Sequence, residues 1–220
     1  MILRKCKLLS LLSILFLLSA CADMHPLKPS SHFEVMAPSV RQAALRKISY
    51  WRMDGAFSIQ QQPENHADIA DFGWKQLGQK SYRIDILSAL GLYSASIQHQ
   101  LGVVKLWKNG THVSTAKTPE KLMQKALGWY LPISPLSSWI KGIPAKNAGY
   151  YEAHYDYYGH LILLKQAGWD LSFQDYKKNE DGHVDFPQLI IMEGHDLRVK
   201  IVIRDWLLFT QRHPIPDAIA

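Results

Sequence analysis

Apolar and polar side chains alternate over many short stretches of the chain, and this alternation limits the fold more than any other feature. The stretch YRIDIL at residues 82–87 places Tyr82, Ile84 and Ile86 on one face and polar groups on the other. A period of two predicts strands that bury one face. Further strands of this kind are expected at residues 54–60, 71–76, 103–116, 150–158, 160–166, 169–175, 186–192 and 197–206.

The turns between these runs are short. Asn109-Gly110 separates two alternating runs, which is a strong signal for a β-hairpin. Many sequential strands joined by tight turns predict a curved or barrel-like antiparallel sheet with a helical insertion. We therefore expect a mainly β (α+β) protein.

Three helices interrupt the strand pattern. We expect the first at residues 38–50, with an apolar face formed by Val40, Ala43, Ala44, Lys47 and Ile48. The second begins at Thr118-Pro119, where Thr118 is the predicted N-cap, and ends near Gly128. The third lies within residues 132–144, which are bounded by prolines.

The N-terminus has the features of a secretory signal. Arg4, Lys5 and Lys7 form a basic start, and an uncharged apolar run covers residues 8–20. At about 1.5 Å per residue this run makes roughly 20 Å of helix, which is too short for the ~30 Å hydrocarbon core. We predict that residues 1–20 are removed.

The end of this run looks like the bacterial lipobox, because Leu18-Ser19-Ala20 precedes Cys21. This motif implies lipidation of Cys21, which would then begin the mature chain. Cys6 lies in the predicted signal, so no intramolecular disulfide is expected. We expect residues 21–37 to be an anchor and tether, 38–210 a single domain and 211–220 a C-terminal tail.

Motifs for catalysis, metals or nucleic acids are not evident. The ten histidines are scattered, and no phosphate loop or G-x-S-x-G motif occurs. Residues 177–188 resemble a calcium loop, but Lys177 and Gln188 stand where carboxylates are needed, so a solvated hairpin turn is expected. The formal charge of +6 falls to +3 without the signal, and no basic run favours nucleic acid. No enzyme activity, metal or cofactor is implied.

The stretch SALGLY at residues 88–93 allows two interpretations. It is an unusually apolar turn around Leu90-Gly91-Leu92, or it is part of a continuous buried strand. No charged side chain occurs from Ile86 to His99, which is compatible with both.

Four segments together resemble the LolB family of outer-membrane lipoprotein receptors. They are RMDGAFSI at 52–59, FGWKQLGQKSYRIDILSALG at 72–91, LPISPLSSWIKGIP at 131–144 and DLRVKIVIRDWLL at 196–208. The resemblance implies an incompletely closed antiparallel β-barrel covered by helices, with an apolar cavity between them. It also implies a protruding membrane-insertion loop, here Leu90, Gly91 and Leu92. Ala89 and the Leu92-Tyr93 pair depart from the family pattern and make this loop more apolar.

The same resemblance implies a function. Family members accept lipoproteins from the periplasmic carrier LolA and insert them into the inner leaflet of the outer membrane. We therefore expect an outer-membrane protein facing the periplasm, anchored through Cys21 and monomeric, whose partners are LolA, lipoprotein acyl chains and leaflet phospholipid, not nucleic acid.

From strand parity and the helix face, we predict the residues that line the acyl-chain cavity. They are Phe57, Ile59, Phe72, Trp74, Tyr82, Ile84, Ile86, Leu122, Met123 and Leu127. For each of them, ordinary core packing is an equally good interpretation. A lipid-anchored scaffold or assembly factor with a filled core is the alternative function, whereas a hydrolase would need a clustered nucleophile and base.

Overall fold

The computed structural model describes residues 33–63, 67–88, 91–127, 131–179 and 184–210. The predicted signal, Cys21, Leu90 and the tail at 211–220 lie outside these residues. No helix in the described part is long and apolar enough to cross a membrane.

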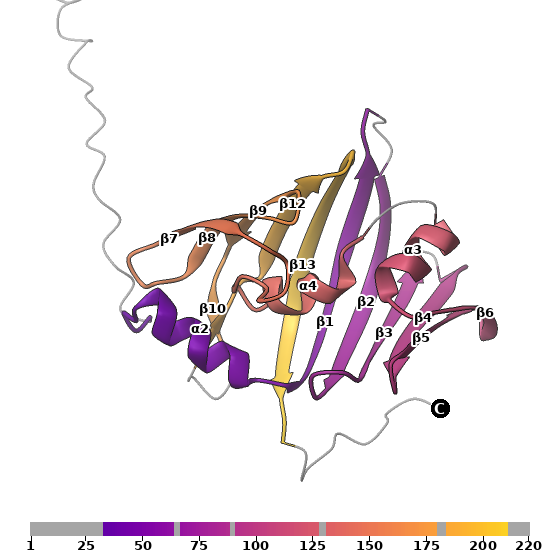
Figure 1. Cartoon of the computed structure of the whole chain (residues 1–220), viewed down its shortest axis with the longest axis horizontal. Helices are drawn as coiled ribbons and strands as arrows, with labels where there is room; N and C mark the ends of the chain where they lie inside the picture. The colour runs from indigo at the N-terminus through magenta and orange to yellow at the C-terminus, as the bar shows by residue number, and fades with distance from the viewer. Residues whose placement is uncertain (1–32, 64–66, 89–90, 128–130, 180–183, 211–220) are drawn as a thin grey trace, which may run out of the picture. The chain divides into compact units, whose positions relative to one another are not determined.

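One eleven-stranded antiparallel sheet forms the body of the protein (Figure 1). Its spatial order is β6-β5-β4-β3-β2-β1-β13-β12-β9-β8-β7. The strands, in chain order, are β1 (Tyr50–Gln61), β2 (Ala67–Leu77), β3 (Tyr82–Ser88), β4 (Ser94–Gln100), β5 (Val103–Lys108), β6 (Thr111–Ala116), β7 (Tyr151–Tyr155), β8 (Leu161–Gln166), β9 (Trp169–Gln174), β12 (Leu189–Gly194) and β13 (Leu197–Leu208). Within the described residues β6 and β7 are edges that do not pair, so the barrel is open.

The first and last strands join the two halves of this sheet. β1 pairs with β13 over almost its whole length, and the register shifts between Asp54 and Gly55. At this β-bulge the backbones approach closely: a Cβ on Gly55 would collide with the carbonyl oxygen of Val202 and the ring of Phe72. The alternation predicted for β13 holds up to the bulge, since Val199, Ile201 and Ile203 are all buried.

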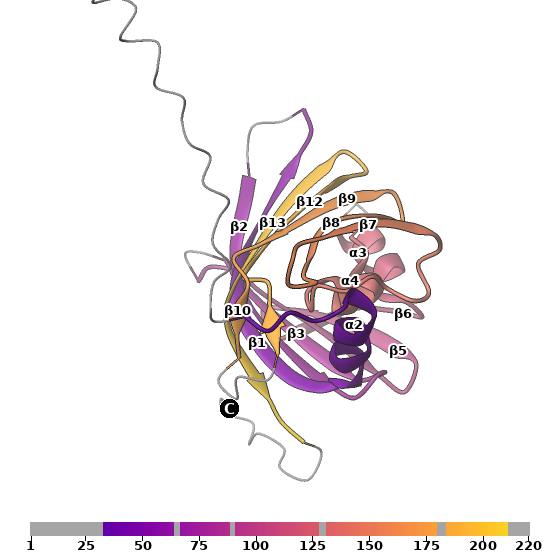
Figure 2. The same cartoon turned by 90° about the vertical axis from the view of Figure 1, so that its left-hand side faces the viewer.

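The sheet curves around two helices, α3 (Pro119–Leu127) and α4 (Ile133–Trp139) (Figure 2). As predicted, Thr118 caps α3: its Oγ1 accepts a hydrogen bond from the Lys121 amide at 3.3 Å. The far end of α4 is fixed by the buried Gln166 side chain, whose Oε1 accepts from the Trp139 indole at 2.8 Å. The expected helix-covered open barrel is therefore confirmed.

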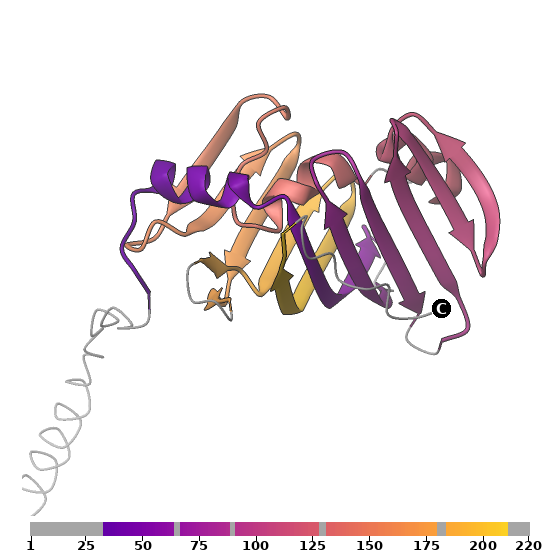
Figure 3. The same ribbon diagram turned by 90° about the horizontal axis from the view of Figure 1, so that it is seen from below.

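A third helix, α2 (Pro38–Lys47), lies over the β7–β8 end of the sheet (Figure 3). Its buried residues are Arg41 and Leu45, whereas Val40 is 55% exposed. The predicted apolar face was therefore wrong. The helix also ends at Lys47, because Tyr50 already belongs to β1.

Arg41 is buried because its charge has a partner distant in sequence. Its Nη1 lies 2.8 Å from Asp185 Oδ2, and His160 Nε2 lies 3.0 Å from the same oxygen. The other ring nitrogen of His160 is 2.9 Å from Asp156. Burial alone would raise the pKa of Asp185, but the hydrogen bonds and charges of His160 and Arg41 outweigh it and lower that pKa.

The end of the predicted tether packs against this buried cluster. The Phe33 ring meets those of Tyr158 and His160 at centroid distances of 5.5 and 5.0 Å. The Met36 amide donates to the Tyr158 carbonyl at 3.3 Å. Gly159 makes room for this crossing, because a Cβ there would collide with the Met36 carbonyl.

The segment at 177–188 forms a short hairpin from β10 (Lys177–Lys178) and β11 (Asp185–Phe186). Asp185 and Phe186 are buried, so the hairpin is less solvated than we expected. Its tip, including the residues that resembled calcium ligands, lies partly outside the described chain.

Candidate functional site

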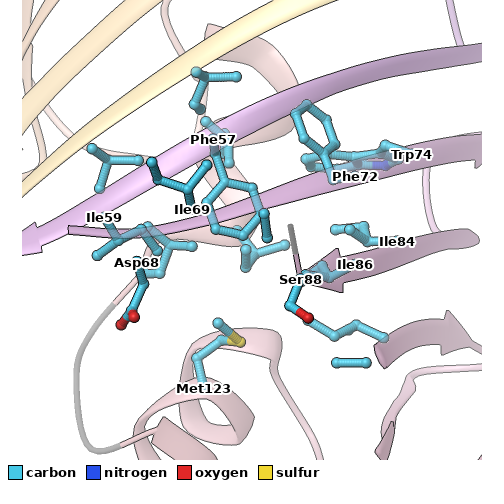
Figure 4. Close-up of a pocket in the computed structure, with 18 of the residues that line it drawn as sticks. Phe57, Ile59, Asp68, Ile69, Phe72, Trp74, Ile84, Ile86, Ser88 and Met123 are labelled. Atoms are coloured by element: carbon cyan, nitrogen blue, oxygen red, sulfur yellow. The ribbon is translucent and has the colours of Figure 1, made fainter. Parts of the chain in front are cut away.

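An apolar cavity of about 460 Å³ lies between the concave face of the sheet and the two helices α3 and α4. In Figure 4, Phe57, Phe72 and Ile84 extend toward it from neighbouring strands, and Met123 faces them from α3. The lining residues are Met53, Phe57, Ile59, Asp68, Ile69, Ala70, Phe72, Trp74, Ile84, Ile86, Ser88, Tyr93, Ala95, Ile97, Leu106, Lys108, Met123, Leu131, Ile133, Leu136, Ile140, Val199 and Ile201. Its volume falls within the ~300–1,000 Å³ range of ligand pockets.

The structure brings most of the predicted lining residues to this cavity. Those around it are Phe57, Ile59, Phe72, Trp74, Ile84, Ile86 and Met123. Leu122 is fully buried but does not line the cavity. The side chain of Leu127 lies outside the described part of the structure.

Tyr82 shares a face with Ile84 and Ile86 but lies beyond the cavity. Its ring packs against Trp74 and His99, at centroid distances of 5.7 and 5.2 Å. Burial, followed by the charge of Glu120, raises the pKa of the Tyr82 phenol well above its ordinary value. The group therefore stays protonated and acts as part of the core.

Several cavity residues were not predicted. Val199 and Ile201 line it from β13, and Ile133, Leu136 and Ile140 line it from α4 and its C-terminal end. The alternation of β13 and the apolar content of the 132–144 segment were both visible in the sequence. What could not be read there is the β1–β13 pairing that brings strands from opposite ends of the chain together.

Polar side chains on the cavity wall gather at one end of the strands. Among the lining residues they are Asp68 near the start of β2, Ser88 at the end of β3 and Lys108 at the end of β5. Because neighbouring strands are antiparallel, these three positions lie at the same end of the sheet. This end lies next to the β3–β4 connection, and we call it the mouth of the cavity.

That connection is a turn, so the continuous-strand interpretation was wrong. β3 ends at Ser88 and β4 begins at Ser94. The Gly91 amide donates to the Ser88 carbonyl at 2.8 Å, and Gly91 has a φ of +67°, which favours glycine. Leu92 is 79% exposed at the turn. Leu90 itself lies outside the described residues.

The opposite, outer face of the sheet carries a polar groove of about 1,180 Å³ over β1–β5. Its charges pair with one another: Arg83 Nε lies 2.8 Å from Asp85, and Arg204 Nη2 lies 2.6 Å from Asp71. This groove is lined by charged side chains of both signs, unlike the apolar wall of the inner cavity. The inner cavity is therefore the candidate site for an apolar ligand.

The fold is similar to that of a solved protein of the LolA superfamily. A LolA-superfamily protein from Nitrosomonas europaea superimposes with a TM-score of 0.54, over 83% of this chain and 96% of that structure. Only 10% of the aligned residues are identical, so this likeness concerns the architecture alone.

The chain belongs to the LolB family, described as Outer membrane lipoprotein LolB, which matches residues 49–206. An outer-membrane lipoprotein LolB of Coxiella burnetii is 42% identical over 191 residues, covering 86% of this chain and 88% of that protein. The LolB of Cellvibrio japonicus is 31% identical over 206 residues, with 92% and 98% covered. This is a family of lipoprotein-trafficking receptors and not of enzymes, so the chain serves lipoprotein localisation at the outer membrane.

Proposed function

We propose that this protein accepts lipoproteins from the periplasmic carrier LolA, shelters their acyl chains in the inner cavity, and inserts them into the inner leaflet of the outer membrane. The observation that carries the proposal is the apolar wall of the cavity, with polar groups confined to its mouth. Phe57, Phe72 and Ile84 would contact the acyl chains on the sheet side, and Met123 on the helix side.

The physical need for such a cavity is large. Burying a methylene group contributes about 0.8 kcal/mol, so an acyl chain of a dozen or more methylenes resists exposure by about 10 kcal/mol. Handover then needs no covalent chemistry. It requires that this cavity bind the chains more tightly than the carrier does, and that the membrane bind them more tightly still.

Release into the membrane is assigned to the β3–β4 turn. Gly91 and Leu92 are the described residues at its tip, and the exposure of Leu92 beside the cavity mouth supports contact with leaflet phospholipid. Leu90, which the family resemblance implies for the same loop, lies outside the described residues. Lipidated Cys21 would hold the monomeric protein at the same membrane. An acidic side chain at the tip would cost about 3 kcal/mol on entering hydrocarbon, so it should impair insertion more than acceptance.

The test is a transfer assay with the lipid-anchored protein in vesicles and a purified carrier–lipoprotein complex. Wild-type protein should move the lipoprotein into the vesicle. Leu90→Glu should still take the lipoprotein from the carrier, as scored by co-purification, but should not release it.

Leu101→Glu is the matched control, because Leu101 is 92% exposed on the β4–β5 turn at the opposite end of the sheet. Normal delivery by Leu90→Glu would show that the β3–β4 turn is not needed for release into the membrane. If folded wild-type protein takes no lipoprotein from a competent carrier and binds no apolar probe, the scaffold alternative replaces the proposal.

A further inference from the structure

The mouth of the cavity carries a cation whose role is not explained by shelter of hydrocarbon. Lys108 is the last residue of β5, and it follows the alternation of Val104 and Leu106, which are both buried on the inner face. The side chain of Lys108 therefore lies on the same inner face, and it lines the cavity. An ammonium group is otherwise an unfavourable neighbour for acyl chains.

Within the described residues, the Lys108 ammonium forms no ion pair. Its recorded contact is with the Tyr93 ring, whose centroid lies 6.0 Å from Nζ, a distance at which cation–π attraction is weak. The other charged group at the mouth, Asp68, comes from β2, with β3 and β4 between it and β5. The donor capacity of Lys108 is thus available to a ligand.

The backbone around Lys108 is firmly held. The Asn109 amide donates to the Ser94 carbonyl at 2.9 Å, and the Ser94 amide donates back to Asn109 Oδ1 at 2.8 Å. These two bonds fix the β5–β6 turn to the start of β4. The ammonium therefore projects from a rigid base on a flexible four-carbon stem, beside the β3–β4 turn.

A lipidated cysteine has polar groups where its acyl chains begin. Each chain ends in an ester carbonyl, or in an amide carbonyl when it is attached to the amino group. When the hydrocarbon lies in the cavity, these carbonyls come to rest at the mouth. They are hydrogen-bond acceptors, and among the polar groups there the ammonium is a donor without acceptor capacity, whereas a carboxylate such as Asp68 only accepts.

We propose that Lys108 is a positioning residue that donates hydrogen bonds to the ester and amide carbonyls of the lipidated cysteine. This inference rests on the proposed function. It adds that the protein recognises the carbonyl groups where the acyl chains of its ligand begin, as well as their hydrocarbon. Ser88 is less suited to this role, because its Oγ already accepts a hydrogen bond from the Tyr93 amide at 3.1 Å. Lys108 thereby sets how deeply the chains enter.

The experiment compares two ligands on the mature full chain carrying Cys21→Ala, which leaves every described residue in place. One ligand is a synthetic tripalmitoyl-cysteinyl peptide, which has the carbonyls, and the other is a naphthyl hydrocarbon probe, which lacks them. Lys108→Met keeps much of the stem and removes the charge. It should weaken binding of the lipopeptide about tenfold, as expected for one charge-assisted hydrogen bond, and leave the probe affinity unchanged.

Two further variants separate a contact with the ligand from a structural effect. Lys108→Arg should restore lipopeptide binding, since it keeps a cationic donor. Lys105→Met is the matched control, because Lys105 is exposed on the outer face of the same strand. This variant should bind both ligands with wild-type affinity.

The outcomes also distinguish this inference from the proposed function. Equal affinities of wild type and Lys108→Met for the lipopeptide would overturn the role of Lys108 and leave the receptor function standing. Equal losses for both ligands would show that the substitution damages the cavity and would also refute carbonyl recognition. Failure of wild type to bind either ligand would overturn the proposed function itself.

Discussion

Lys141 is a buried cation. The free energy that its burial costs the folded protein can be measured from the pH dependence of stability. Lys141 follows α4, it is 8% exposed, and its Nζ donates to the Ile48 carbonyl at 3.2 Å. Burial, together with the nearby charge of Arg46, lowers its pKa from 10.5 to about 8. The folded protein therefore binds this proton less tightly than the unfolded chain does.

The sign of the pH dependence follows from linkage. Between the folded pKa near 8 and the unfolded value of 10.5, the unfolded state carries more protons, so stability rises with pH. At pH 7 the charged lysine costs the folded state about 3 kcal/mol, and by pH 9.5 about 2 kcal/mol of this is recovered.

The measurement is urea unfolding of wild type and Lys141→Met at pH 7 and at pH 9.5. Other groups that titrate in this range cancel in the comparison, and Tyr82 and Tyr176, whose pKa values are raised by burial, matter only at higher pH. The wild type should gain about 2 kcal/mol relative to the variant as pH rises. A parallel response of the two proteins would refute the reasoning.

Two further predictions concern the cavity and the buried charges. Ala95→Phe should fill the cavity and abolish binding of an apolar fluorescent probe, whereas Ser96→Phe on the outer face should not; unchanged probe affinity in Ala95→Phe would contradict the location of the site. Asp185→Asn should lower the free energy of unfolding by about 3 kcal/mol at pH 7, because it leaves buried Arg41 and His160 without their shared carboxylate. Since the Asp185 pKa is lowered in the folded state, its contribution is present above about pH 4 and is lost as pH falls further, so urea unfolding should show a steeper acid loss in wild type than in the variant.

Strand faces were predictable from the sequence because the period of two is imposed by the backbone itself. The alternation expected for residues 169–175 places Trp169, Leu171 and Phe173 on one face, and all three are buried. The alternation of side chains shows which face of a strand a residue lies on, but not how far along the strand a cavity extends. This is why Tyr82 was assigned to the cavity with Ile84, although only the part of β3 nearer the mouth reaches it.

The α2 helix shows what local patterns cannot reveal. Its buried face contains Arg41, a residue that no hydrophobicity pattern would place inside. The partner that makes this burial possible, Asp185, lies 144 positions away in sequence. The bulge opposite Asp54, which re-aims the end of β13, depends in the same way on a pairing between opposite ends of the chain.

For the proposed function, the edges at β6 and β7, which do not pair within the described residues, have a consequence for how much cargo the cavity can hold. At roughly 30 Å³ for a water-sized group such as a methylene, the cavity of about 460 Å³ has room for about one long acyl chain. In a closed barrel, strand number and stagger fix the diameter, and extra cargo would have to break hydrogen bonds. Here the barrel is open between β6 and β7, so these two edges could move apart while the hydrogen bonds between all neighbouring strands remain in place. Such a movement would enlarge the cavity without loss of strand pairing, and a closed barrel would not allow it.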